Sequence, residues 1–393
     1  MSEWRDGTLK DIAYIEYGKS PKDVKVEYSD IPIFGTSGQV GYAVKTLFEG
    51  PLVMIGRKGT INKPLLIKGD CWIIDTAYAA KPKQNVDVQW LYYCLIYSKL
   101  EKLNEATGVP SLNRENLYNL KLTVPPVKEQ QKIASILSSV DKTIEKTEDI
   151  IKQTKKAKKG LMQQLLTRGI GHTKFKKTEV GDIPCDWERV PLKNLVEENR
   201  TICYGVLKPG EFIENGIPML RVVDLGDGKV KGSGFHRISK ELDKEYSRSR
   251  LKGNEVLISL VGTIGRIAVT ESYHQFMNVH RNIGIIPVND KKINKRYLAY
   301  MMQSEMVQKE IKVKTTGGSQ PLFNIGDLKE LKILLPSLEE QLKIVNFISS
   351  VDKKLELEMK KQLQLEFLKV GLMQSLLTGK VRIKVDEAEV TQV

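Results

Sequence analysis

Loops bounded by glycine hold most of the side chains in this sequence that could recognise another molecule. Gly35 to Gln39 and Gly56 to Thr60 lie between short apolar runs, and similar loops in the second half carry arginines. Arg, Lys, Asn and Gln are the side chains that pair with guanine and adenine edges, and loops on a rigid sheet are their usual place. The candidates for contact with nucleic acid are Thr36, Ser37, Gln39, Arg57, Lys58, Thr60, Ser111, Asn113, Arg221, Arg266, His280, Arg281, Asn282, Ser319, Gln320 and Asn324. For each of them, ordinary turn chemistry is an equally open interpretation.

Two of these loops follow the same pattern in the two halves of the chain. TGVPSLNRENL begins at Thr107 and TGGSQPLFNIGDL begins at Thr316, each just before a predicted strand. A pattern present twice is less suited to reading different sequences. It fits contact with DNA phosphates, which position a protein without specifying a sequence, or loop structure alone. Both interpretations stay open.

Motifs for catalysis or cofactor binding are not found in the sequence. Gly56 to Thr60 differs from the phosphate-loop pattern GxxxxGK[ST]. Pro125-Pro126 is followed by Val127, so it does not complete the Asn/Asp-Pro-Pro-aromatic signature of adenine methyltransferases. The four histidines and four cysteines show no metal-ligand spacing. We therefore predict no catalytic residue, no cofactor, no metal, and reduced thiols.

Composition and charge limit the class of protein further. The 393 residues predict two or three domains, and the formal net charge of +14 suggests a polyanionic partner. No apolar run is long enough to span a bilayer, and the first residues lack the apolar region of a signal peptide. We expect a cytoplasmic protein that does not contact a membrane.

The second half of the chain repeats part of the first. KEQQKIASILSSVDKTIE begins at Lys128 and EEQLKIVNFISSVDKKLE at Glu339, while GLMQQLLT and GLMQSLLT begin at Gly160 and Gly371. All pairs align at one offset of 211 residues, and residues 128–169 share 19 identities in 42 positions with residues 339–380. The regions in front of the repeats are divergent. The order is therefore variable, constant, variable, constant, which is an internal duplication.

Each constant segment predicts one long helix. Neither segment contains proline, and both carry a stripe of positions at alternating steps of four and three, which is a heptad pattern. In the first segment the stripe positions are Ile133, Leu137, Val140, Ile144, Thr147, Ile151, Thr154, Lys158, Leu161 and Leu165. In the second they are Ile344, Ile348, Val351, Leu355, Glu358, Gln362, Leu365, Lys369, Leu372 and Leu376. We predict an antiparallel helix pair; separate packing of each helix on its own domain is the alternative.

The flanks of these helices carry further signals. Ser337 to Glu340 predicts a capping box at the start of the second helix, and Pro125-Pro126 suits the first turn of the first helix. Between Lys152 and Lys177 there are nine Lys or Arg residues and no acidic residue. This basic stretch fits either a solvated helix face or contact with DNA or an acidic partner.

The two variable regions share one pattern of elements. Short β-branched runs punctuated by glycine predict strands, and each region has one helical stretch near its end: VQWLYYCLIYSKLEKLNEA after Asp87, and RYLAYMMQSEMVQKEI from near Lys295. Trp4 and Trp187 lie at comparable places, as do Gly59-Thr60-Ile61 and Gly262-Thr263-Ile264. The predicted fold class is α+β, with two similar mixed α/β domains separated by two long antiparallel coiled-coil helices and an internal pseudo-twofold repeat.

This pattern resembles the specificity (S) subunit of type I restriction-modification systems, the HsdS family. The resemblance covers nearly the whole chain. It rests on Pro-x-x-x-Glu-Gln-x-x-Ile at Pro125 to Ile133 and again at Pro336 to Ile344, and on the SSVDK and GLMQ-x-LLT segments, each present twice. Each motif is short, but their duplication around two divergent domains makes the signal specific.

The resemblance implies two target-recognition domains, each reading one half of a bipartite, asymmetric site in double-stranded DNA. It implies two methyltransferase (M) subunits docked on the helices, and restriction (R) subunits in the full complex, with ATP, Mg²⁺ and S-adenosylmethionine used by those partners. The expected segments are recognition domain 1 (1–127), spacer helix 1 (128–168), a linker (169–184), recognition domain 2 (185–338), spacer helix 2 (339–380) and a tail (381–393). The family often has a short segment before the first domain, and here the tail is expected to complete the pseudo-symmetry.

Two other functions are weighed against this interpretation. A fused type IIG-like methyltransferase or nuclease would carry catalytic motifs, which the sequence lacks. A coiled-coil scaffold with two protein-binding domains would explain the helices but not the basic charge or the polar loops.

Overall fold

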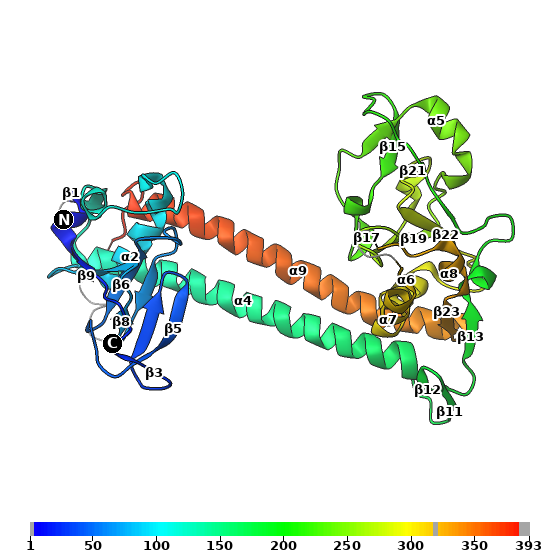
Figure 1. Cartoon of the computed structure of the whole chain (residues 1–393), viewed down its shortest axis with the longest axis horizontal. Helices are drawn as coiled ribbons and strands as arrows, with labels where there is room; N and C mark the ends of the chain where they lie inside the picture. The colour runs from blue at the N-terminus through cyan, green and yellow to red at the C-terminus, as the bar shows by residue number, and fades with distance from the viewer. Residues whose placement is uncertain (1–3, 317–320, 385–393) are drawn as a thin grey trace. The chain divides into compact units, whose positions relative to one another are not determined.

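The computed structural model describes residues 4–316 and 321–384. The chain forms two compact units, one of residues 1–150 with 358–393 and one of residues 151–357. Two long helices, α4 (Val127–Arg168) and α9 (Leu338–Leu377), each contribute one part to each unit (Figure 1). With 42 and 40 residues they are far longer than the other helices of the described chain.

The first unit contains small sheets and short helices. Its strands are β1 (Arg5–Thr8), β2 (Ala13–Tyr17), β3 (Lys25–Val26), β4 (Pro32–Gly35), β5 (Gly38–Ala43), β6 (Leu52–Gly56), β7 (Leu65–Ile67), β8 (Trp72–Ile73), β9 (Ala77–Pro82) and β10 (Lys121–Val124). Its short helices are α1 (Leu9–Ile12), α2 (Val88–Tyr97), η1 (Leu100–Leu103) and α3 (Arg114–Tyr118). One sheet has the order β2-β9-β6-β7, a second has the order β3-β5-β4-β8, and β1 pairs with β10.

The core of the first unit joins this domain to the long helices. Strand β6 is apolar and every one of its residues is buried. Helix α2 begins after Asp87, whose side chain accepts a hydrogen bond from the Trp90 N–H, as expected of an N-cap. Trp90 and Leu95 of α2 share one buried cluster with Leu137 of α4 and Leu376 of α9. The domain therefore packs on both helices.

The second unit has the same kinds of element. Its strands are β11 (Phe175–Thr178), β12 (Gly181–Pro184), β13 (Glu188–Pro191), β14 (Cys203–Tyr204), β15 (Ile217–Leu220), β16 (Leu225–Gly226), β17 (Gly228–Val230), β18 (His236–Ile238), β19 (Glu255–Ser259), β20 (Ile267–Val269), β21 (Asn278–Val279), β22 (Ile283–Pro287) and β23 (Lys332–Leu335). Its helical segments are η2 (Leu192–Leu195), η3 (Val222–Asp224), α5 (Lys240–Glu245), η4 (Ser247–Ser249), η5 (Ser272–His274), α6 (Lys295–Gln303), α7 (Glu305–Lys314) and α8 (Ile325–Glu330). The sheets have the orders β14-β22-β19-β20-β17-β16 and β18-β15-β21, with separate pairs β13-β23 and β11-β12.

Strand pairing shows that the two domains share one fold. The pairs β1-β10, β6-β9 and β2-β9 of the first domain correspond to β13-β23, β19-β22 and β14-β22 of the second, all antiparallel. The parallel pair β4-β8 corresponds to β15-β21. Tyr17 faces Tyr78 across the first sheet, as Tyr204 faces Gly284 across the second. These registers place residues of the two domains in correspondence where their sequences have diverged.

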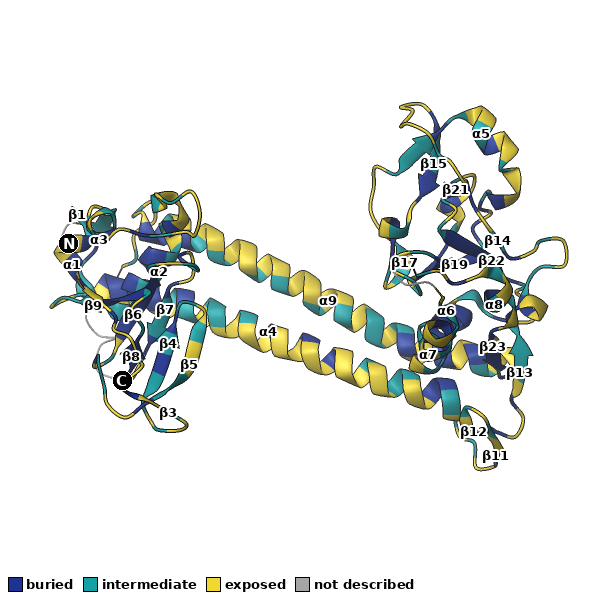
Figure 2. Cartoon of the chain, in the orientation of Figure 1, coloured by how far each residue is buried: buried dark blue, intermediate teal, exposed yellow. Residues whose placement is uncertain are grey.

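The two long helices run antiparallel in each unit. In the first unit Lys369 pairs with Asp141, and the Gln362 amide donates a hydrogen bond to Glu148. Residue numbers along α9 therefore decrease in the direction in which those along α4 increase. In the second unit Lys158 pairs with Asp352. Each of the twenty predicted stripe positions is buried or half-buried, and the predicted heptad pairing is confirmed. Figure 2 shows buried and half-buried residues, in dark blue and teal, at intervals along both helices among exposed residues in yellow.

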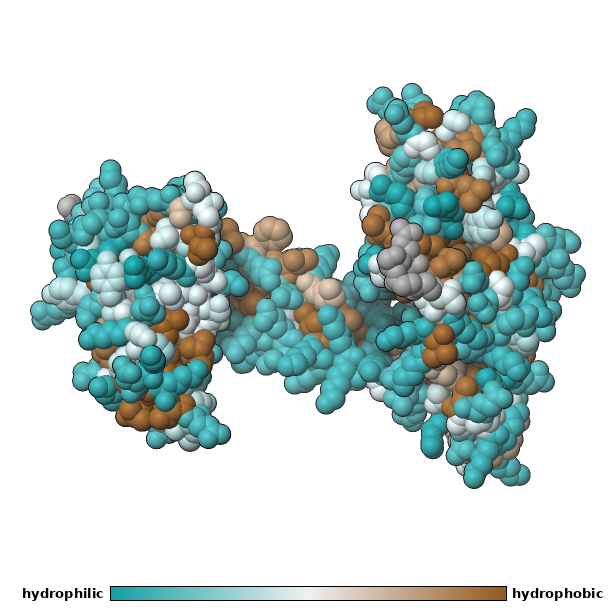
Figure 3. All heavy atoms as spheres, in the orientation of Figure 1, coloured by the Kyte–Doolittle hydropathy of each residue, from teal (hydrophilic) through white to brown (hydrophobic). Residues whose placement is uncertain are grey.

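One face of α9 is apolar and exposed. Leu363, Phe367 and Val370 follow one another at steps of four and three, and their exposed fractions are 55%, 77% and 63%. Figure 3 shows hydrophobic side chains along α9. At the offset of 211 residues, α4 carries Lys152, Lys156 and Lys159 at the same places. The two duplicated helices therefore present different chemistry on equivalent faces.

Three local predictions need correction. The first domain helix ends at Tyr97 and a 3-10 turn follows after Lys99, which has a positive φ of 50°. The second is two helices, because the hydroxyl of Ser304 caps α7 by accepting the Val307 N–H. At the start of α9 the Ser337 hydroxyl accepts the Glu340 N–H, but the Glu340 carboxylate accepts a hydrogen bond from Trp187 and does not complete the capping box.

Within the described residues, no helix is long and apolar enough to cross a membrane.

Candidate nucleic-acid interface

In the first domain, three loops from different parts of the sequence meet. The turn between β4 and β5 holds Thr36, and a Cβ atom added to Gly59 would lie 3.9 Å from its Oγ1. Lys58 forms a β-bridge with Ser111, and the Leu112 N–H donates to the Arg57 carbonyl at 2.9 Å. The structure therefore brings together candidates from the loops at 35–39, 56–60 and 107–117.

An exposed tyrosine flanked by two guanidinium groups marks this site. Arg57 lies over the Tyr17 ring at 5.2 Å and Arg114 lies over it at 5.0 Å. The Arg57 guanidinium also donates to the Asp75 carbonyl at 3.0 Å, which fixes its position. Tyr17 is 45% exposed. Aromatic rings and cations on one surface can stack on bases and attract phosphates.

At the equivalent place, the second domain is apolar. Val261 bridges Leu322 as Lys58 bridges Ser111, and the Phe323 N–H donates to the Leu260 carbonyl at 2.9 Å as Leu112 does to Arg57. An open cavity of about 570 Å³ lies here. Its lining consists of Tyr204, Leu207, Leu260, Val261, Arg281, Asn282, Leu322, Phe323, Asn324, Ile325 and Gly326. Three candidates, Arg281, Asn282 and Asn324, therefore surround one cavity.

The other two arginines of the second domain lie beside η3. The Arg221 guanidinium is 3.6 Å from the Asp224 carboxylate, and the Arg266 guanidinium is 3.5 Å from the Val222 carbonyl. Arg266 also lines a cavity of about 400 Å³ with Lys231 and Gln303. The structure thus places five candidates of this domain in two groups.

All candidates within the described residues are exposed or half-buried, so none is excluded by burial. Asn113 also caps α3, since its side chain accepts the Glu115 N–H at 2.9 Å. Burial lowers the pKa of His280, and the neighbouring Arg281 lowers it further, so this ring is neutral at pH 7. Ser319 and Gln320 lie outside the described residues.

Sequence reasoning missed Tyr17, Tyr204 and Arg114. The two tyrosines end β2 and β14, and each precedes a glycine. A Cβ atom on Gly18 would lie 2.1 Å from the Ile74 carbonyl oxygen, and one on Gly205 would lie 1.8 Å from that of Val279. The Tyr-Gly dipeptide is present twice in the printed sequence, and this repeat was the available signal.

The duplicated Glu-Gln dipeptide has a structural role. The indole of Trp4 donates to Glu129 at 2.9 Å, and that of Trp187 donates to Glu340 at 3.0 Å. Arg382 from the chain beyond α9 completes the first site, while His172 from the chain beyond α4 lies 2.8 Å from Glu340 in the second. The described part of the tail therefore takes the place that residues 170–172 occupy in the other copy.

The adjacent glutamine of each dipeptide fixes a domain helix. Gln130 donates to the Pro125 carbonyl at 2.8 Å and accepts the Asp87 N–H at 2.8 Å. Gln341 donates to Pro336 at 2.9 Å and accepts the Asn294 N–H at 2.8 Å. Because Asp87 and Asn294 cap α2 and α6, each glutamine ties a long helix to the start of a domain helix.

The aspartate of each SSVDK segment holds three elements together. Tyr93 of α2 donates to Asp141 at 2.8 Å, and Lys369 pairs with the same carboxylate. Tyr300 of α6 donates to Asp352 at 2.8 Å, and Lys158 pairs with it. The offset of 211 relates Asp141 to Asp352 and Lys158 to Lys369, so the two clusters are copies of one arrangement. The repeated motifs therefore explain how each domain is oriented on the helix pair.

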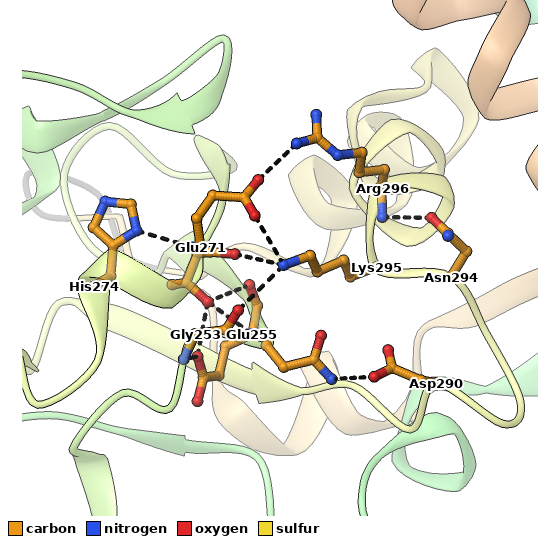
Figure 4. A network of polar contacts seen from close by, with 10 residues as sticks. Gly253, Glu255, Glu271, His274, Asp290, Asn294, Lys295 and Arg296 are labelled. Atoms are coloured by element: carbon orange, nitrogen blue, oxygen red, sulfur yellow. Dashed lines mark hydrogen bonds and ion pairs between the residues drawn. The ribbon is translucent and has the colours of Figure 1, made fainter.

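A second polar network in the second domain is also structural (Figure 4). The Lys295 ammonium at the start of α6 donates to the Gly253 carbonyl at 3.1 Å and to the Glu271 carboxylate at 3.1 Å. The buried carboxylate of Glu255 accepts the Gly253 N–H and pairs with Arg200 at 2.8 Å. Lys295 therefore connects α6 with the residues that flank β19 and β20, while Glu255 connects β19 with Arg200. Within residues 4–316 and 321–384, no cluster of His, Cys, Asp or Glu could hold a metal ion.

Each domain has the same fold, carries different side chains at equivalent loops and packs on the long helices. Such a chain belongs to a class of protein that presents two chemically different surfaces on one fold. Comparison with known proteins gives the family. Residues 1–156 and 184–366 match the model of the type I restriction modification DNA specificity domain. The chain belongs to this family and is a DNA specificity subunit of a type I restriction-modification system.

Relatives and solved structures agree with this assignment. The chain is 32% identical over 339 residues to the type I restriction enzyme MjaVIII specificity subunit of Methanocaldococcus jannaschii, covering 84% of this chain and 76% of that protein. It is 29% identical to the EcoBI specificity subunit of Escherichia coli over 320 residues, or 76% and 66% of the two chains. The crystal structure of the S subunit from M. genitalium has the same fold, with a TM-score of 0.62 at 16% identity over 95% and 96% of the chains.

Proposed function

We propose that each domain of this subunit reads one half of a bipartite, asymmetric DNA site in the cytoplasm. The observation that carries the proposal is the contrast at equivalent positions: Arg57 and Lys58 in the first domain are matched by Leu260 and Val261 in the second. Direct readout depends on the side chains that reach base edges. Two surfaces of one shape and different chemistry are therefore suited to two different half-sites.

Domain exchange tests this proposal. We propose recognition domains at residues 1–127 and 185–338, spacer helices at 128–168 and 339–380, a linker at 169–184 and a tail at 381–393. The first domain would be replaced by that of a relative, with α4 left intact, and the methylated motif would be determined by methylome sequencing of the host. One half of the motif should change and the other should stay. If both halves change, or neither does, the two domains do not read separate half-sites.

We propose that the helix pair docks two methyltransferase subunits, with restriction subunits joining the complex. The exposed face of Leu363, Phe367 and Val370 supports this, because contiguous exposed apolar side chains mark sites of protein contact. The lysines at the equivalent places on α4 would give the second docking face a different chemistry. The two methyltransferase subunits are therefore expected to bind with unequal affinity.

Copurification with the methyltransferase subunit tests the docking face. Leu363→Ser combined with Phe367→Ser should weaken one of the two binding events by at least tenfold, since each removes an apolar anchor. Val313→Ser is the matched control, because Val313 is 84% exposed but lies on α7. Unchanged stoichiometry and affinity of the double variant would rule out this face.

We also propose that the chain has no catalytic activity of its own and that cofactors are used by its partners. The purified subunit should neither methylate nor cleave DNA. Titration calorimetry with S-adenosylmethionine should give no binding heat until the methyltransferase subunit is added. Stoichiometric binding to the subunit alone would contradict the proposal and favour a fused enzyme.

A further inference from the structure

The cavity of the second domain is open, apolar and lacks an occupant from the described chain. Phe323 and Leu260 are buried and form its floor, while Tyr204, Leu207 and Leu322 are 37%, 42% and 40% exposed. Exposed apolar side chains around a concave surface are unfavourable in water unless a ligand covers them. The apolar lining therefore favours a ligand that places an apolar group in the cavity.

The rim of the cavity is polar and positive. Arg281 carries the only formal charge among the lining residues, and no carboxylate lines the cavity. The side chains of Arg281 and Asn282 form no hydrogen bond or ion pair with another described residue. An anionic ligand that offers both an apolar group and hydrogen-bonding edges would satisfy the floor and the rim together.

Among the edges that DNA presents, only thymine fits these requirements. In the major groove its 5-methyl group is the single apolar feature of the four bases, and apolar side chains are its usual partners. Arg and Asn on the rim suit the polar edges of neighbouring purines or the phosphates. At the equivalent place of the first domain, Arg57, Lys58 and Arg114 offer cations, which suit guanine or phosphate instead.

We propose that this cavity is a thymine-reading site, in which the exposed side chains of Tyr204, Leu207 and Leu322 receive the 5-methyl group of a thymine in the half-site of the second domain. The inference rests on the proposed function, because it requires that this domain reads a half-site. It adds that equivalent places of the two domains recognise different base features. Cationic side chains lie at this place in the first domain, and apolar side chains lie there in the second.

The test uses the complex of the full chain with its methyltransferase subunits and a duplex containing the methylated motif. Each thymine of the half-site that changes on exchange of the second domain is replaced by deoxyuridine, which keeps base pairing and removes only the methyl group. At one position the affinity should fall about fourfold, the effect of removing one buried methyl from an apolar site. Uracil in the other half-site is the control for the DNA.

Two variants assign the effect to the cavity. Leu322→Ala and Leu207→Ala alter exposed side chains, so both should fold, and Leu322→Ala should abolish the discrimination between thymine and uracil. Val313→Ala, on an exposed surface outside the cavity, should keep it. The inference is overturned if the half-site has no thymine, if no thymine is sensitive to the replacement, or if both cavity variants keep the discrimination.

A protein partner in the cavity would give a different result. If the Leu322 and Leu207 variants weaken binding of the methyltransferase subunit without DNA, and uracil has no effect, then an apolar side chain of that subunit occupies the cavity and the inference is wrong. If domain exchange leaves the motif unchanged, the proposed function fails before the thymine experiment begins. The two failures are therefore distinguishable.

Discussion

The duplicated Tyr–Asp–Lys clusters allow a sharp prediction about how the domains are held on the helices. Asp141 accepts a hydrogen bond from Tyr93 at 2.8 Å and contacts Lys369 at 2.6 Å, and the Asp and Lys side chains are 32% and 22% exposed. Hydrogen bonds to charged groups contribute about 1.5–3 kcal/mol, and exposed ion pairs about 0.2–1 kcal/mol. We therefore expect Asp141→Asn to lower the free energy of unfolding by about 2 kcal/mol.

Urea unfolding of the full chain, followed by circular dichroism, measures this change. In heat, the same loss corresponds to a decrease in Tm of about 4–8 °C for a unit of this size. Asp352→Asn, in the equivalent cluster, should have an effect of the same size because its contacts are 2.8 Å to Tyr300 and 2.6 Å to Lys158.

A double-mutant cycle provides the control. Asp141→Asn with Lys369→Gln should show a coupling energy of about 1 kcal/mol, as residues in direct contact do. Asp141→Asn with Lys158→Gln should be additive within about 0.5 kcal/mol, because these residues belong to different clusters. Equal coupling in both cycles, or none in the first, would refute the reasoning.

Three further predictions concern acid stability, spacing and DNA contact. Burial alone would raise the pKa of Glu129, but hydrogen bonds from Arg382, Trp4 and the Ile383 N–H outweigh burial, so the pKa of Glu129 is lowered. The stability that Glu129 contributes should therefore be complete above about pH 5. It should be lost as the pH falls through the lowered pKa. Thermal melts against pH should therefore converge for wild type and Glu129→Gln at acidic pH, and parallel curves would contradict this. Deleting residues 144–150 and 355–361 removes one heptad, about 10 Å, from each helix. Methylome sequencing should show unchanged half-sites with a gap about three base pairs shorter. An active variant that keeps the original gap would show that the helix length does not set the distance between the half-sites. If Arg57 reads a base, Arg57→Ala should relax specificity by about 1–3 kcal/mol. If Arg57 contacts phosphate, the same variant should flatten the salt dependence of binding by about one unit. Binding assays at several salt concentrations separate the two outcomes, and unchanged specificity with unchanged salt dependence would show that Arg57 does not contact DNA.

Much of the architecture could be predicted from the sequence because it is carried by local and repeated patterns. The heptad steps predicted which residues of each long helix form its buried stripe. The stripe positions from Ile133 to Leu165 on α4 and from Ile344 to Leu376 on α9 are all buried or half-buried. Helix extent was less predictable. The helical pattern runs across Ser304, but its hydroxyl caps a new helix, and this depends on a side-chain hydrogen bond that periodicity does not reveal.

The candidate site was predictable only in part. Glycine-bounded loops pointed to Arg57, Arg281 and Asn324, since turn residues are recognisable locally. Arg114 and Tyr204 were missed because their importance comes from neighbours distant in sequence. The Glu-Gln and SSVDK motifs were visible as repeats, but repetition did not show what they contact.

By itself, the sequence determined the duplication, the two long helices and the family, because identity at a constant offset and a heptad period are properties of the chain. Only the tertiary structure decided that loops distant in sequence meet in each domain, as Lys58 does with Ser111 and as Val261 does with Leu322. The repeated Gly-Thr-Ile anchors already align Lys58 with Val261 in sequence, but no local pattern places Lys58 beside Ser111. That contact depends on strand pairing and packing, since backbone hydrogen bonds place a residue in space regardless of its side chain.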